Sequence, residues 1–425
     1  MINFLELDSG SRLVYEKIEH TEVCSIGLWF LNGSIDENPG EKGYAHFIEH
    51  ILFKGTASRS TSEIAQAFER IGSNFNAFTE KELTCFYCTF PTKHIKYVID
   101  LLTEIIFKPL FDYKEIKKEK NVIISEINEY LELPEENSYD LFIEKMWLPH
   151  PLGYKITGEP EDILNIKKKS LYNYYSERYN PGNLVISAAG YFEEELLVNL
   201  LNASIPSYSL IKNPGSITAK RTKPDYKYNY EYFKYPSKQI HLHTGIAFPT
   251  PSGMKDYYNL LFFSTIMGES MGSRLYQKLR EENGYCYTIY AFRSIYNFYS
   301  MWNIYANTIP KFLNNFMEKL EIELKNILIN SISISEIADA RTHLEGGLLL
   351  SQEDMELRMR RLARHYIFSG RCFDFSESME MLFSVTRDDI DQFINTNLLN
   401  KDFNVLIYGD AGKTKYKDYN ISIKG

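Results

Sequence analysis

The stretch Gly43-Tyr-Ala-His-Phe-Ile-Glu-His-Ile-Leu-Phe53 has the apolar spacing of a helix and contains two histidines four positions apart. Residues four apart lie one above the other on a helix, so His46 and His50 present two imidazoles to one point. Zinc accepts such nitrogens at about 2.0–2.1 Å. Glu49 lies near the same face, where its carboxylate can accept a proton from water at the metal. The alternative is a helix with two surface histidines, but the apolar neighbours indicate a core, so a zinc site is predicted.

A zinc hydrolase needs a third protein ligand and one open coordination position. The helical run from Lys114 to Glu129 offers three carboxylates for this role. Glu119 and Glu126 are two helical turns apart and share a face, and Glu129 follows three residues later. Spacing alone does not choose among the three, and in isolation the segment is typical of a solvated charged helix.

The inverted order His-x-x-Glu-His, followed by the glutamate of Val122-Ile-Ile-Ser-Glu-Ile127, resembles the pitrilysin and insulinase type of zinc metallopeptidase. The sequence is similar to the processing-peptidase branch, which includes the catalytic subunit of the mitochondrial processing peptidase and bacterial homologues. The similarity extends through Gly27–Ser34, His50–Thr56 and Asn76–Thr79 and covers essentially the whole chain. It implies one Zn²⁺ per chain, with Glu126 as the third ligand and Glu119 as an outer carboxylate that assists catalysis.

A repeat at half the chain length divides the 425 residues, which are too many for a single core. Ser62–Gly72 aligns with Ser273–Asn283, sharing the apolar positions of one helical face. At the same offset, the residues that correspond to the two histidines and Glu49 are an aromatic and two apolar side chains, Tyr257, Leu260 and Leu261. The second copy therefore lacks the zinc ligands. We expect a zinc-binding half at residues 1–205, a Pro-containing linker at 206–228 and a degenerate half at 229–425.

Periodicity predicts an α+β fold of two homologous halves, each a mostly antiparallel sheet covered on one face by helices. The expected strands are 23–30, 74–78, 83–90, 184–189, 240–247, 301–306 and, by the repeat, 404–407. The expected helices are 43–53, 61–71, 94–107, 114–131, 256–267, 312–329 and 355–367.

In the degenerate half, the resemblance implies an arginine and a tyrosine seven residues apart that hold the substrate and polarise the scissile carbonyl. Arg280 and Tyr287 fit that spacing. From composition alone, Arg280 would be an exposed helix residue and Tyr287 one of 32 tyrosines. The resemblance also implies that Asn76, Ala77 and Phe78 form an edge strand to which a substrate peptide is added as a further strand.

Composition narrows the classes of partner and compartment. The formal charge of −9 provides no basic field for nucleic acid or anionic lipid. Five scattered cysteines, the lack of a signal-like N-terminus and the short apolar runs predict a cytoplasmic protein without a membrane segment. Cys85 and Cys88 lie in a strand-like run, so their thiols are expected to point to opposite faces. The expected partners are peptide substrates and a second copy of this chain.

The predicted function is a zinc-dependent endopeptidase that cleaves unfolded or short peptides in an enclosed chamber. Zinc would activate a water molecule and Glu49 would accept its proton. The alternatives are a non-catalytic peptide-binding or structural subunit of a heteromeric peptidase, a catalytic subunit whose partner supplies the arginine and tyrosine, and a zinc-storage protein. The intact motif argues against the first, Arg280 and Tyr287 against the second, and Glu49 against the third.

Overall fold

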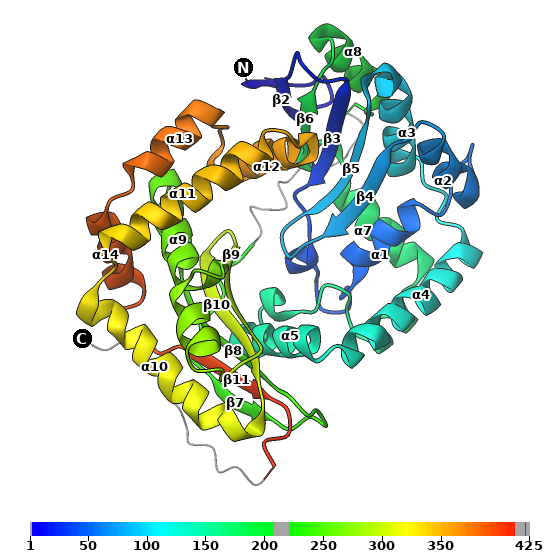
Figure 1. Cartoon of the computed structure of the whole chain (residues 1–425). Helices are drawn as coiled ribbons and strands as arrows, with labels where there is room; N and C mark the ends of the chain where they lie inside the picture. The colour runs from blue at the N-terminus through cyan, green and yellow to red at the C-terminus, as the bar shows by residue number, and fades with distance from the viewer. Residues whose placement is uncertain (1, 208–220, 413–420, 422–425) are drawn as a thin grey trace. The chain divides into compact units, whose positions relative to one another are not determined.

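The computed structural model describes residues 2–207, 221–412 and residue 421. Contacts divide the chain into two compact units, each built on one sheet (Figure 1). Unit 1 contains Met1–Glu129, Tyr154–Thr222 and Leu349–Asp374; unit 2 contains Tyr130–Gly153, Lys223–Leu348 and Phe375–Gly425. Most of the predicted linker, residues 208–220, lies outside the described residues.

Unit 1 has a six-stranded sheet in the order β1-β2-β6-β3-β5-β4. Its strands are β1 (Ile2–Glu6), β2 (Arg12–Lys17), β3 (Val23–Phe30), β4 (Asn74–Thr79), β5 (Thr84–Pro91) and β6 (Leu184–Gly190). Neighbouring strands are antiparallel except β2 and β6, which are parallel. Strand β4 is the last strand of the sheet, so one of its backbone edges is open.

The helices of unit 1 come mostly from the first half of the chain. They are α1 (Tyr44–Leu52), α2 (Thr61–Glu69), α3 (Ile95–Phe107), α4 (Tyr113–Glu132, as far as Glu129), α6 (Pro160–Asn165), α7 (Lys168–Arg178) and α8 (Glu194–Ser204), together with α12 (Met355–Ser369) from the second half. Figure 1 shows α1, α3 and α4 beside the sheet and α12 near β3 and β6.

Strand alternation gives unit 1 two apolar layers. On β3, the side chains of Cys24, Ile26, Leu28 and Phe30 belong to the larger core cluster, which they share with α1, α3 and α7. Trp29 points to the opposite face, where it packs with residues of α12. The indole N–H of Trp29 donates to the Ser187 hydroxyl at 2.8 Å, so this buried polar atom is satisfied.

Unit 2 has a five-stranded sheet in the order β7-β11-β8-β10-β9, antiparallel except for the pair β7 and β11. Its strands are β7 (Tyr230–Phe233), β8 (Ile240–Pro249), β9 (Thr288–Ile295), β10 (Tyr299–Thr308) and β11 (Asn404–Tyr408). Its helices are α5 (Pro134–Trp147), α9 (Met254–Ser264), α10 (Leu313–Asn330), α11 (Ile334–Ser351, as far as Leu348), α13 (Phe375–Ser384) and α14 (Arg387–Asn397).

The predicted α+β class, with two largely antiparallel sheets and covering helices, is confirmed. Cys85 and Cys88 are buried on opposite faces of β5, as expected from strand alternation. Two helices pack in the unit that is built mainly from the other half of the chain, which the repeat does not predict. Helix α5, encoded in the first half, packs on β8 and β11 of unit 2, and α12, encoded in the second half, packs on β2, β3 and β6 of unit 1. The division into halves at residues 205 and 229 stays a prediction about the repeat.

Among the described residues, no helix combines the length and the apolar composition needed to cross a membrane.

Candidate metal centre

The first turn of α1 is fixed by glycine and by a buried carboxylate. Gly43, the N-cap, has φ of 80°, and a Cβ there would lie 2.6 Å from the carbonyl oxygen of Thr157, so a side chain is excluded. The carboxylate of Glu37 accepts the N–H of Gly43 at 3.0 Å and the N–H of Ala45 at 2.9 Å. These bonds satisfy two amides at the helix start, within one turn of His46. Burial raises the pKa of Glu37 well above its ordinary value, while the two amide donors oppose the shift.

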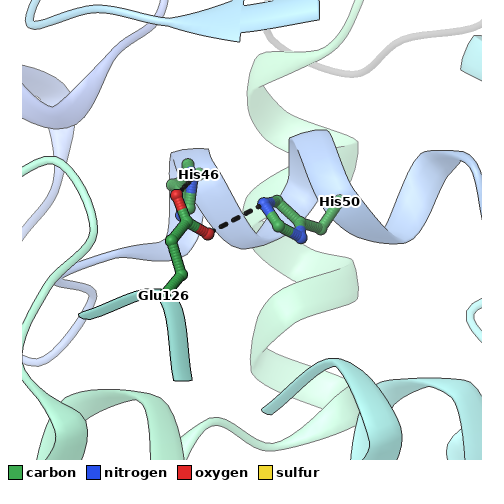
Figure 2. Close-up of side chains that lie close together, drawn as sticks. All are labelled: His46, His50 and Glu126. Carbon is green, nitrogen blue, oxygen red and sulfur yellow. Dashed lines mark ion pairs between the residues drawn. The ribbon is translucent and has the colours of Figure 1, made fainter. Parts of the chain in front are cut away.

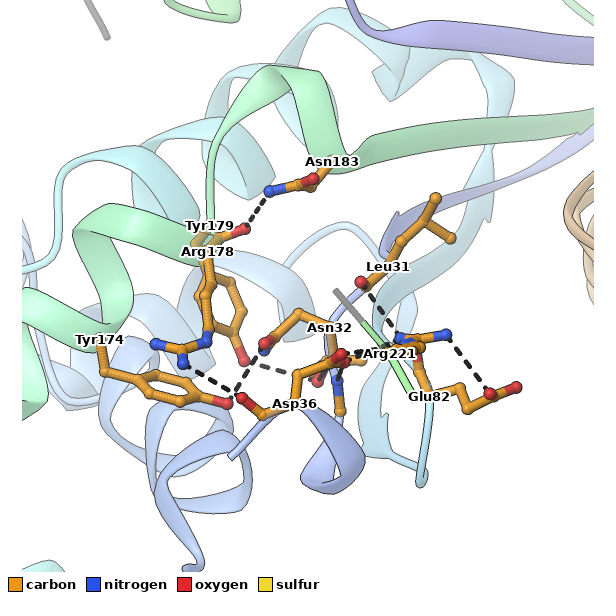
Figure 3. A network of polar contacts seen from close by, with 11 residues as sticks. Leu31, Asn32, Asp36, Glu82, Tyr174, Arg178, Tyr179, Asn183 and Arg221 are labelled. Atoms are coloured by element: carbon orange, nitrogen blue, oxygen red, sulfur yellow. Dashed lines mark hydrogen bonds and ion pairs between the residues drawn. The ribbon is translucent and has the colours of Figure 1, made fainter. Parts of the chain in front are cut away.

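A polar network holds the loop that leads from β3 into α1 (Figure 3). The Arg221 guanidinium donates to both carboxylate oxygens of Asp36 at 2.9 and 2.8 Å, and both side chains are almost fully buried. Arg178 donates to the backbone carbonyl of Asp36 at 3.1 Å and lies over the ring of Tyr174, with its Cζ 3.9 Å from the ring centroid. Because Asp36 precedes Glu37, this clamp also fixes the residue that caps α1.

His46, His50 and Glu126 come together at one point of unit 1 (Figure 2). Their nearest ligand atoms all lie within 4.8 Å of one another. One oxygen of Glu126 is 3.6 Å from Nε2 of His46, and the other is 3.5 Å from Nε2 of His50. Two tetrahedral zinc ligands at 2.0–2.1 Å lie about 3.3 Å apart, so these separations fit a zinc ion.

The chemistry of the donor set fits the same metal. Two imidazoles and one carboxylate are a ligand set of catalytic zinc sites. Burial, with the neighbouring His50 as a smaller cause, lowers the pKa of His46 to about 3, which keeps this imidazole neutral and able to ligate. Among the described residues, these three form the one group of three or more His, Cys, Asp or Glu side chains with this spacing. Glu129, the competing candidate on α4, is exposed and outside the group.

Glu119 lies behind His50. Its carboxylate is 3.1 Å from Nδ1 of His50 and 2.9 Å from Nζ of Lys54. Burial alone would raise the pKa of Glu119, but the bonds with His50 and Lys54 outweigh it and the pKa lies below its ordinary value. An ionised partner on Nδ1 leaves Nε2 as the lone-pair nitrogen, the atom that faces Glu126. The structure thus places Glu119 in contact with a histidine of the cluster rather than in the cluster.

Glu49 lies on α1 between the two histidines. The Thr79 hydroxyl donates to Oε2 of Glu49 at 2.5 Å. Burial raises the pKa of Glu49; Thr79 and His50 oppose this shift, and the charge of Glu126 adds to it. Burial, with the charges of Glu129 and Glu119, likewise raises the pKa of Glu126. Both carboxylates therefore lie in surroundings that a cation would stabilise.

Strand β4 brings the predicted peptide-docking residues to the open edge of the sheet. The backbone N–H of Ala77 donates to the side-chain oxygen of Asn76 at 2.8 Å. Asn76 is exposed, and Phe78 packs at the edge of the smaller core cluster of unit 1. The strand and helix α1 are in contact, so the open edge and the three-residue cluster belong to one surface region of unit 1.

Arg280 and Tyr287 lie together in unit 2. Arg280 is in a π-helical segment, Tyr276–Glu281, and its Cζ lies 5.5 Å from the centroid of the Tyr287 ring. Tyr287 is 74% exposed, which is unusual for a large aromatic side chain. The structure thus brings the two predicted residues into contact with each other, and their role toward a substrate stays a prediction.

Comparison with known proteins identifies the family. Residues 12–159 match the family model described as Insulinase (Peptidase family M16), and residues 165–344 match the Peptidase M16 inactive domain. The uncharacterized zinc protease YmxG of Bacillus subtilis is 31% identical over 412 residues, which cover 97% of this chain and 99% of the relative. The chain belongs to the insulinase family of peptidases, M16.

A further relative is similar in sequence, and two solved structures share the fold, over nearly the whole chain. An uncharacterized zinc protease of Mycobacterium leprae is 28% identical over 413 residues, covering 96% of this chain and 92% of the relative. The fold matches a crystal structure described as the peptidase M16 inactive domain from Pseudomonas fluorescens, with a TM-score of 0.87, 19% identity and coverage of 98% and 100%. A Helicobacter pylori protease gives a TM-score of 0.87 at 18% identity, covering 96% of this chain and 99% of that one.

Three polar residues of the M16 site region were not found from the sequence. Lys54 pairs with Glu119, and Glu37 accepts a hydrogen bond from the start of α1. Thr79 donates to Glu49. Lys54 lies one turn beyond His50, so helical spacing offered a signal. Thr79 is 30 residues from Glu49 and Glu37 lies in a loop, so neither position has a spacing that links it to the motif.

Proposed function

We propose that this M16 chain is a zinc-dependent endopeptidase that acts on unfolded or short peptides. The observation that carries the proposal is the cluster of His46, His50 and Glu126 with Glu49 beside it on the same helix. A zinc-storage site would not need Glu49, which is partly buried and hydrogen-bonded but outside the ligand cluster.

Three side chains would hold the metal, and the others would handle the proton. His46, His50 and Glu126 would ligate zinc, which supplies Lewis acidity and lowers the pKa of water at the site. Because Oε2 of Glu49 already accepts the Thr79 hydroxyl, Oε1 would take the proton from water. Glu49 would then pass that proton to the amine that leaves when the peptide bond breaks.

The open edge of β4 supports peptides as the substrate class. A peptide that adds to a sheet edge must be extended and must expose its backbone groups, which unfolded segments and short peptides do. Backbone pairing is also tolerant of sequence. The proposal therefore includes Asn76, Ala77 and Phe78 as the residues of the docking strand.

Unit 2 would supply the groups that stabilise negative charge on the scissile carbonyl. Arg280 carries a permanent positive charge and Tyr287 an exposed hydroxyl, and both are suited to donate hydrogen bonds to an oxyanion. Their contact with each other supports a shared role.

Metal removal and restoration test this function. Purified protein is treated with a chelator, dialysed, and assayed with a pool of quenched fluorescent peptides before and after one equivalent of Zn²⁺ is added. We expect cleavage to be lost with the metal and restored by zinc. Cleavage that is unchanged in protein shown by elemental analysis to be metal-free would contradict the proposal.

A further inference from the structure

Thr79 is the last residue of β4, and its backbone faces the open edge of the sheet. The N–H of Glu80 donates to the carbonyl of Leu83 at 2.8 Å, which closes the hairpin between β4 and β5. In an antiparallel ladder, hydrogen-bonded and non-hydrogen-bonded pairs alternate. Glu80 and Leu83 form a hydrogen-bonded pair, so the adjacent pair of Thr79 and Thr84 is a non-hydrogen-bonded one. The N–H and C=O of Thr79 therefore point away from β5. The same alternation places the N–H of Ala77 at the open edge.

The side chain of Thr79 points to helix α1, which carries Glu49 and the two histidines. Its hydroxyl donates to Oε2 of Glu49 at 2.5 Å, and no other side-chain donor is recorded for Glu49 among the described residues. Glu49 is partly buried, so its carboxylate depends in part on protein groups for the hydrogen bonds that water would otherwise give. A single hydrogen bond at Oε2 fixes the rotation of the carboxylate. Oε1 then has a fixed direction and no hydrogen bond from Thr79, so it can accept a proton.

From these contacts we propose that Thr79 is a positioning residue that orients Glu49 and ties it to the peptide-docking edge. The inference rests on the proposed function. Within one residue, the backbone faces the edge on which a peptide would pair and the hydroxyl holds the group that would accept the proton. A peptide that pairs at this edge fixes the backbone of Thr79, and through the hydroxyl it fixes Glu49.

The alternative role for Thr79 is simple packing at the end of a strand. A packing role depends on the volume of the side chain and on its methyl group, whereas the positioning role depends on the hydroxyl. Valine has the shape of threonine without the hydroxyl, and serine keeps the hydroxyl without the methyl. The two substitutions therefore separate the roles.

Steady-state kinetics of Thr79→Val and Thr79→Ser form the first test. We expect Thr79→Val to lower kcat at least about 10-fold with KM and zinc content unchanged, since an orienting bond of a general base is lost. Thr79→Ser should keep most of the wild-type kcat. If Thr79→Val does not fold, Thr79→Ala is compared with Thr79→Ser, since both lack the methyl and only the serine has a hydroxyl. Equal kcat values for wild type and Thr79→Val, or for the Ala and Ser variants, would overturn the inference.

Thermal unfolding of zinc-free protein tests the contact without any activity. Thr79→Val should lower the Tm of the wild type, because Glu49 loses its partner, and should not lower the Tm of Glu49→Ala. Equal Tm shifts in the two backgrounds would show that the hydroxyl does not act through Glu49. Failure of the proposed function is distinguishable: the wild type would then cleave no peptide with zinc bound, while the Tm comparison would still report on the contact.

Discussion

At the scale of single residues, the two units place histidines in different environments. His50 of unit 1 has a carboxylate at each ring nitrogen, Glu119 at Nδ1 and Glu126 at Nε2. His243 of unit 2 is 2% exposed, its Nε2 is 2.8 Å from the Ser138 hydroxyl, and no carboxylate of the described residues forms an ion pair with it. The first environment suits a metal ligand, and the second suits a neutral histidine packed in a core.

The surroundings of His243 predict a pH dependence of the stability of unit 2. Burial, with the neighbouring His241, lowers the pKa of His243 to about 3 from an ordinary 6.5. Between pH 6.5 and 3, His243 is protonated in the unfolded chain but neutral in the folded protein. The free energy of unfolding therefore has its full value above pH 6.5 and falls as the pH drops toward 3. Between pH 6.5 and 5 the loss from this group is roughly 2 kcal/mol.

Urea unfolding at several pH values, compared with His243→Asn, measures this contribution. The variant lacks the titrating group, so its stability should fall less steeply below pH 6.5 than that of the wild type. Parallel pH profiles for the two proteins would contradict the assignment to His243.

At the scale of elements, α1 and β4 position the site. Helix α1 begins at a glycine with positive φ and is capped by Glu37, and these bonds place the two histidines on the face toward α4. Strand β4 contributes its open edge and the hydroxyl of Thr79. The proposed ligands thus come from two helices, and the proposed docking residues from a neighbouring strand.

The open edge of β4 predicts the effect of removing one backbone donor. Ala77→Pro removes the outward N–H without breaking the β4–β5 ladder, because that N–H is not part of the ladder. We expect KM for peptide cleavage to rise roughly 10-fold, the cost of about one backbone hydrogen bond, with zinc content unchanged. Ala77→Gly, which keeps the N–H, is the control and should resemble the wild type. A proline variant with wild-type KM would rule out pairing at this residue.

The helix and strands that carry the site residues could be predicted from the sequence, whereas several of the helices that follow them along the chain could not. The i, i+4 spacing of His46 and His50 predicted α1, and alternation predicted β3, β4 and β5. Helices α5, α6 and α8 were not predicted; α5, for example, begins with the polar run Pro134–Asp140 and has little apolar periodicity. The place of Glu126 could not be derived from spacing, because the packing of α4 against α1, rather than the sequence of α4, selects it over Glu129.

At the scale of the whole molecule, the repeat explains why one unit holds the ligand cluster. Helix α9 of unit 2 corresponds to α1 at the offset of the repeat, and where α1 has two histidines and Glu49 it has Tyr257, Leu260 and Leu261. The exchange of α5 and α12 makes each unit depend on a segment encoded in the other half. A sequence repeat cannot show which unit a helix packs in, because the repeat relates local residue patterns and carries no information on contacts.

The proposed division of labour predicts that unit 2 can be impaired without loss of metal. Arg280→Ala or Tyr287→Phe should lower kcat/KM by roughly 10-fold or more, since each removes a donor to the developing oxyanion. Zinc content should stay at one per chain, because the proposed ligands are in unit 1. Lys278→Ala, which lies in the same π-helical segment and pairs with Glu282, is the control. Loss of zinc in either variant would show that these residues support the metal site instead.

Glu49→Gln removes the carboxylate that would accept the proton from water, and so tests the proposed mechanism. Zinc content by elemental analysis and cleavage of a quenched fluorescent peptide are measured on the same preparation of wild type and variant. We expect one zinc per chain in both proteins and a turnover about 10² to 10⁴ times lower in the variant, the contribution of a general base. Full zinc content with undiminished turnover in Glu49→Gln would contradict it.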